Sequence, residues 1–95
     1  MASSKEYRDY IIEQAGLDGI THRPMMGEYL LYFKGILFGG IYDNRLLVKI
    51  TAENGKFNME KQLPYDGAKE MYMVDDTENA DRLKDIILTT CKGLK

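Results

Sequence analysis

A chain of 95 residues, of which 44% are hydrophobic, has room for one hydrophobic core, so the sequence predicts a single domain over residues 1–95. Its 13 basic and 15 acidic residues leave a net charge of −2, which disfavours direct nucleic-acid binding because phosphates require excess positive charge. No apolar run approaches the roughly 18 residues of a membrane helix, and we expect no membrane partner. A single cysteine and a polar start without a secretory signal predict a cytoplasmic protein.

The first predicted element is a helix from about Lys5 to Ala15. Ser3 and Glu6 have the spacing of a capping box, in which a serine oxygen and a glutamate satisfy free amide donors at a helix start. Gly16 supplies the left-handed stop. The residues expected on the inner face follow the three-and-four spacing of a helix and are Tyr7, Tyr10, Ile11 and Gln14.

Four short apolar runs come next and predict an antiparallel meander. The pairs Lys34-Gly35 and Asp43-Asn44 have the length and residue types of two-residue hairpin turns, which rules out parallel pairing. The predicted strands are Ile20 to Met26, Glu28 to Phe33, Ile36 to Tyr42, and Arg45 to Ile50.

The last part of the chain predicts a loop, a strand and a helix. Residues 51–70 lose periodicity and are expected to form a loop with one short helix, before a fifth strand from Met71 to Val74. Asp75, Asp76 and Thr77 offer caps for the final helix. Its inner stripe is predicted as Ala80, Leu83, Ile87, Thr90 and Leu94, with Ile86 and Cys91 at the border. The fold class is therefore α+β: an antiparallel β-meander of about five strands flanked by an N-terminal and a C-terminal helix.

The sequence offers no recognisable catalytic or metal centre. Its only histidine is His22 and its only cysteine is Cys91, 69 positions apart, so clustered zinc ligands and a thiol-imidazole pair are not expected. The acids at 75–78 lack the glycine and distal glutamate of a calcium loop. We therefore predict a protein that is not an enzyme and holds no cofactor.

The opening of the meander resembles a known family. The motif Arg23-Pro24-Met25-Met26-Gly27, the hairpin Tyr32 to Gly35, Phe38, and the strand Leu46 to Lys49 are similar to the TfoX amino-terminal domain, with Met26 in place of an aromatic residue. The likeness covers nearly the whole chain. It implies an α+β fold similar to type III secretion chaperones and a regulatory role, which in better-known members concerns natural competence.

Strict alternation along the predicted strands assigns each residue to a face of the sheet. One face receives Leu30, Tyr32, Leu37, Gly39, Ile41, Leu46, Val48 and Ile50. The other receives Tyr29, Leu31, Phe33, Ile36, Phe38, Gly40, Tyr42, Arg45, Leu47 and Lys49. Two helices can cover one face, which we expect to leave the second, aromatic face exposed.

An exposed apolar face predicts protein binding. The candidate interaction surface, on this face or on the edge strand, consists of Arg23, Met25, Tyr29, Leu31, Phe33, Phe38, Arg45, Leu47 and Lys49. Its expected partner is a regulatory protein or a second copy in a homodimer. In the alternative interpretation, each face carries one helix or the 51–70 loop covers the patch, and a one-residue slip of register would exchange the two faces.

A second hypothesis is a sensor of small ligands. The cleft beneath the 51–70 loop would then bind a metabolite, with Tyr65, Lys49 and Arg23 as polar contacts.

Overall fold

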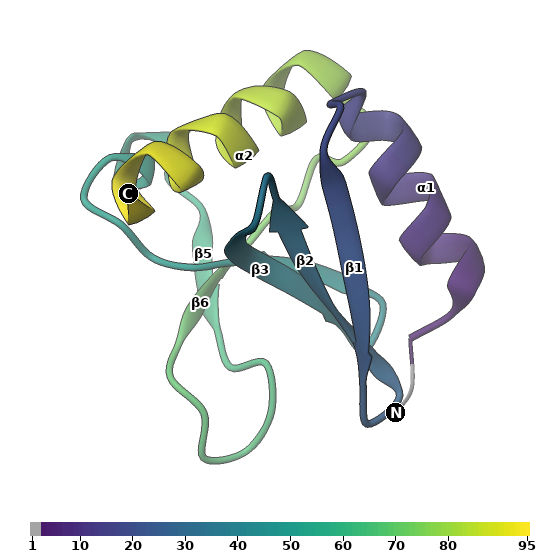
Figure 1. The fold of residues 1–95 in the computed structure, drawn as a ribbon. Helices are drawn as coiled ribbons and strands as arrows, with labels where there is room; N and C mark the ends of the chain where they lie inside the picture. Colours follow the sequence, from purple (N-terminus) through teal and green to yellow (C-terminus); the bar gives the residue numbers. More distant parts are fainter. Residues whose placement is uncertain (1–2) are drawn as a thin grey trace.

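The computed structural model describes residues 3–95, which fold into two α-helices and a six-stranded antiparallel sheet (Figure 1). The predicted α+β fold is confirmed, with one strand more than expected. Along the sheet, the strand order is β1-β2-β3-β4-β6-β5, and the sheet is open. The elements are α1 (Lys5–Ala15), β1 (Ile20–Met25), β2 (Glu28–Phe33), β3 (Ile36–Tyr42), β4 (Arg45–Val48), the 3-10 helix η1 (Asn54–Phe57), β5 (Glu60–Gln62), β6 (Met71–Met73) and α2 (Ala80–Leu94).

Helix α1 has its predicted bounds but a different cap. The Ser4 hydroxyl, and not that of Ser3, accepts the Tyr7 backbone N–H at 3.1 Å. Ser3 instead binds Glu28. Its backbone N–H and its hydroxyl both donate to the Glu28 carboxylate, at 2.9 and 2.6 Å. The predicted capping box is therefore wrong, whereas Gly16 ends the helix in the left-handed conformation as expected.

Three tight turns set the register of the meander. Lys34-Gly35 and Asp43-Asn44 have positive φ at both positions, as predicted for two-residue hairpins. Met26-Gly27 makes a third such turn, with φ of 51° and 86°, in place of the last residue of the predicted first strand. Gly27 indicated a bulge or tight bend at this point, but a bulky side chain at positive φ is uncommon, so Met26 was expected in the strand and not in the turn.

A β-bulge in β3 interrupts the strict alternation of side chains between the two faces of the sheet. Leu31 pairs with Gly39 but Tyr32 pairs with Leu37, so Phe38 has no partner residue on β2. One inserted residue exchanges the faces of everything that follows it.

The helix-covered face of the sheet therefore combines residues from both predicted lists. Both helices pack on this one side (Figure 1). The sheet residues on the helix-covered face are Tyr29, Leu31, Phe33, Ile36, Phe38, Ile41, Leu46, Val48 and Tyr72. The helices contribute Ile11, Ala15, Leu83, Ile86, Ile87 and Cys91 to the same core. In α2, Ala80 is exposed, so the predicted inner stripe is shifted toward Ile86 and Cys91.

A buried asparagine organises the turn between β4 and η1. Asn54 accepts the Thr51 backbone N–H at 2.9 Å and donates to the Lys49 carbonyl at 2.8 Å and to the Thr90 hydroxyl at 2.9 Å. The predicted short helix in this loop is confirmed as η1, whereas β5 was not predicted. Helix α2 is capped by Asn79 rather than by the acids at 75–76 or by Thr77.

Candidate functional site

The four hydrophobic residues at the centre of the predicted interaction surface lie on the helix-covered face. Leu31 and Phe38 are 0% exposed, and Tyr29 and Phe33 are half-buried against the same core. The bulge at Phe38 is the physical reason, because it places these residues with Ile41 and Val48 under the helices. The prediction that they form an exposed patch is wrong.

The remaining predicted residues, Arg23, Met25, Arg45, Leu47 and Lys49, belong to the opposite side of the sheet. We call this side the helix-free face. Its members along the strands include Arg23, Met25, Leu30, Tyr32, Leu37, Tyr42, Arg45, Leu47, Met71 and Met73. The face has two halves, one open toward β1 and one overlaid by the segment between β5 and β6.

The open half carries a cationic and an aromatic side chain together. The guanidinium of Arg23 lies 6.0 Å from the centre of the Tyr32 ring. Arg23 is exposed, and Tyr32 is half-buried. Met25 is also half-buried, next to the hairpin turn. Of the two strands that end the sheet, β1 is the longer, so this half borders an open edge.

Leu47 and Arg45 have structural roles on the other half. Leu47 is 0% exposed, so it cannot contact a partner. Arg45 donates to the Gln62 side-chain oxygen at 2.5 Å and to the Leu63 carbonyl at 3.3 Å, which ties β4 to the end of β5. The prediction that these two residues are part of a free binding surface is wrong, because Leu47 is buried and Arg45 is bound to Gln62 and Leu63.

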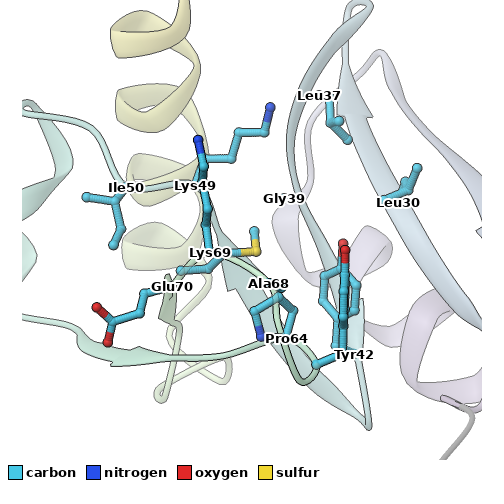
Figure 2. Close-up of a pocket in the computed structure, with 12 residues that line it drawn as sticks. Leu30, Leu37, Gly39, Tyr42, Lys49, Ile50, Pro64, Ala68, Lys69 and Glu70 are labelled. Carbon is cyan, nitrogen blue, oxygen red and sulfur yellow. The ribbon is translucent and has the colours of Figure 1, made fainter.

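That segment, residues 63–70, forms one wall of a cleft. The cleft has a volume of about 520 Å³ and opens on the helix-free face, and Figure 2 shows the residues around it. The lining residues are Leu30, Leu37, Gly39, Tyr42, Lys49, Ile50, Pro64, Tyr65, Ala68, Lys69, Glu70 and Met71. The cleft expected beneath the 51–70 loop is present and includes Lys49 and Tyr65, whereas Arg23 lies outside its lining.

Packing and turn geometry hold the wall in place. The rings of Tyr42 and Tyr65 lie 6.3 Å apart at an angle of 47°, and Pro64 is buried. The Ala68 backbone N–H donates to the Tyr65 carbonyl at 3.2 Å and closes a turn. Tyr42 itself needs a glycine nearby, because a Cβ at Gly40 would stand 2.8 Å from its ring. The cleft is therefore a built feature of the fold.

Positive charge is concentrated in the cleft. Among residues 3–95, neither Lys49 nor Lys69 forms a salt bridge, and neither ammonium has a hydrogen-bond partner. Figure 2 shows the carboxylate of Glu70 on the outer side, away from Leu37 and Tyr42. Two unpaired ammonium groups beside apolar walls favour a negatively charged ligand.

The tyrosine at the base of the cleft remains a hydrogen-bond donor. Burial, followed by the nearby Tyr65 and Glu28, raises the pKa of Tyr42 above its ordinary value of 10.0. Its hydroxyl therefore keeps its proton at neutral and moderately alkaline pH.

The single histidine and the single cysteine of the sequence both lie outside the cleft lining. Cys91 is a buried residue of α2, and burial raises the pKa of its thiol above 9.0, which disfavours the reactive thiolate. His22 is exposed on β1, with its ring packed edge-on against Tyr29 at 6.0 Å. Within residues 3–95, no three His, Cys, Asp or Glu side chains are grouped closely enough to hold a metal ion.

Comparison with known proteins gives a relative over nearly the full length. The chain is 36% identical over 98 residues to a protein of Spirochaeta aurantia named as an uncharacterized 12.7 kDa protein in the trpE 5′ region. The match covers 99% of this chain and 85% of that protein. The chain belongs to the family of this spirochaete protein. No protein-family model matches the chain.

The cleft lies within the stretch shared with this family, since the match takes in 99% of the chain. The relative's name states no activity. The shared sequence therefore supports a common fold, and function must be inferred from the residues of the site. In the part of the chain that the structure describes, no helix has the length and apolar character required to cross a membrane.

Proposed function

We propose that the chain is a non-enzymatic regulatory module that binds a small molecule in the cleft of its helix-free face. The observation that supports this is the cleft itself. Ligand sites are typically concave, mostly apolar, and supplied with a few polar groups that orient the ligand. A volume of about 520 Å³, with apolar walls and polar groups from Lys49, Lys69 and two tyrosines, has these properties.

The positions of the single cysteine and the single histidine support a function without catalysis. A nucleophile must be paired with a base near the bound substrate. Cys91 is buried on the opposite side of the sheet from the cleft, and His22 is on the edge strand and does not line it. We propose reversible binding in the cytoplasm as the activity.

The test is a thermal-shift screen of a metabolite library. We expect at least one compound to raise the melting temperature in a dose-dependent way, because ligands that bind only the folded state stabilise it. Ala68→Trp, which fills the cleft from its wall, should abolish the shift. Ala52→Trp is the matched control, since Ala52 is exposed and does not line the cleft. The proposal would be refuted if no compound raised the melting temperature, or if the rise in Ala68→Trp were as large as in the wild type.

A second candidate function is docking of a protein partner, or of a second copy, at the β1–β2 hairpin. The specific observation is Met26, which is 98% exposed and has a φ of 51°. An apolar side chain kept in a strained and fully exposed turn position is more readily explained by contact with another protein than by stability. Exposed residues 21–24 on the adjoining edge strand would extend the contact.

Sedimentation velocity over a range of concentrations tests this second function. Docking of a second copy predicts a dimer whose population rises with concentration and falls in Met26→Asn, because asparagine suits the turn but removes the apolar contact. A monomer at every concentration would exclude the homodimer. A protein partner captured by the wild type should then be lost with Met26→Asn, and equal capture by both would exclude the hairpin.

The resemblance to TfoX amino-terminal domains extends this proposal to regulation of competence or transcription. The supporting feature is the motif from Arg23 to Gly27, which forms the end of β1 and the turn into β2. Deletion of the gene in its host, followed by measurement of DNA uptake and transcript levels, tests this role. Unchanged uptake and unchanged transcripts would contradict it.

A further inference from the structure

We infer that the cleft on the helix-free face takes a small organic acid, with one carboxylate held by Lys49 and Lys69 and an apolar body of ring size against the sheet. This inference rests on the proposed function, because it names the ligand class of the same cleft. It is carried by three features: the charge of the lining, the apolar floor, and the lack of a phosphate-binding element.

The charge of the lining sets the charge of the ligand. Lys49 and Lys69 contribute two positive charges and Glu70 one negative charge, which leaves a net charge of +1 in the cleft, against −2 for the whole chain. In Figure 2 the Glu70 carboxylate points outward, whereas the two lysine side chains lie between Ile50 and Leu37. A single negative charge on the ligand balances this lining.

The floor of the cleft indicates that the rest of the ligand is apolar. Leu30 and Leu37 line it from β2 and β3, Met71 lines it from β6, and Tyr42 and Tyr65 form an aromatic corner. Gly39 adds only backbone to the lining. Apolar and aromatic walls of this kind favour a flat hydrocarbon or aromatic body.

A phosphate group fits the cleft less well than a carboxylate. Phosphates are usually held by backbone N–H groups at the start of a helix or in a glycine-rich loop. Both α-helices pack on the opposite face of the sheet, so neither helix start faces the cleft. Lysine ammonium groups are flexible point charges that suit a carboxylate of variable placement.

The test compares two probes of the same shape by calorimetry. 3-Phenylpropionate carries the proposed carboxylate, and 3-phenylpropionamide is its neutral counterpart. We expect the acid to bind about tenfold more tightly than the amide, the difference expected for a charge-assisted hydrogen bond. Lys49→Gln and Lys69→Gln should each reduce this preference. Lys84→Gln is the matched control, because it removes the same charge from an exposed position of α2 outside the cleft.

The outcomes separate this inference from the proposed function. Equal binding of acid and amide would overturn the assignment of an acid while the cleft stayed a ligand site. Loss of the preference in Lys84→Gln as much as in the two cleft variants would also overturn it, by showing a general charge effect. No binding of the acid would refute the inference, and the library screen with Ala68→Trp would then decide the proposed function separately.

Discussion

Asn54 shows how one polar side chain can hold two parts of this small core together. Its side chain is fully buried, and it links the turn after β4 to Thr90 on α2. Gly93 on the same helix packs against this turn, because a Cβ there would stand 2.7 Å from the Thr51 Cβ. The position of α2 over the sheet therefore depends on contacts between single residues.

Replacement of Asn54 is expected to destabilise the protein strongly. Asn54→Ala leaves the Lys49 carbonyl and the Thr90 hydroxyl buried without this donor, which should lower the free energy of unfolding by about 2–4 kcal/mol. Asn79→Ala, which removes only an exposed helix cap, should cost about 1 kcal/mol. Urea denaturation measures both. Equal losses in the two variants would contradict the role assigned to Asn54.

At the scale of elements, the bulge in β3 decides which face of the sheet is buried. Gly39 follows the extra residue, and a Cβ at this position would lie 2.1 Å from the Leu47 carbonyl oxygen. Strand β4 therefore approaches β3 closely only because residue 39 has no side chain. The bulge and the glycine together bring Ile41 and Val48 to the helix-covered face.

A methyl group at Gly39 should disrupt this arrangement. We expect Gly39→Ala to lower the free energy of unfolding by at least about 2 kcal/mol, because backbone and not a flexible side chain must move. Gly55→Ala is the control, since its Cβ would meet only the Tyr72 hydroxyl at 3.7 Å, and it should change stability by less than about 0.5 kcal/mol. Thermal unfolding compares the two. A neutral Gly39→Ala would show that the bulge is not tightly constrained.

The elements were largely predictable from the sequence, whereas the face they expose was not. Periodicity and turn residues predicted the bounds of α1, β2 and β3 because these signals are local. The adjacent glycines Gly39 and Gly40 are a weak signal of a bulge and do not fix its position, and one extra residue was enough to exchange the faces beyond it. Tyr65 and Lys49 were predicted as cleft residues, but Leu30, Leu37 and Lys69 meet them only through tertiary packing.

For the whole molecule, buried tyrosine and cysteine side chains make stability decrease at alkaline pH. Burial raises the pKa values of Tyr7, Tyr42 and Cys91 in the folded state. The unfolded chain therefore loses these protons first, and their contribution to stability is complete below the ordinary values of 9.0 for cysteine and 10.0 for tyrosine. It is lost as the pH rises through the higher values of the folded state.

Urea denaturation as a function of pH checks this prediction. The free energy of unfolding should fall as the pH rises above about 9, and Cys91→Ala should delay the start of that fall toward the range of the tyrosines. A stability that is constant or increases above this pH would contradict the assignment of these groups as buried in their protonated form.

The helix-free face, with its cleft, is the surface that we propose binds the ligand. The most direct measurement is NMR titration of the isotope-labelled protein with a compound that binds in the library screen. The changes in backbone amide chemical shift then map the binding site. We expect the perturbed amides to cluster at Leu30, Leu37, Lys49, Tyr65, Ala68 and Met71. Perturbations confined to α1, α2 and the helix-covered face, with the cleft amides unchanged, would contradict the proposal.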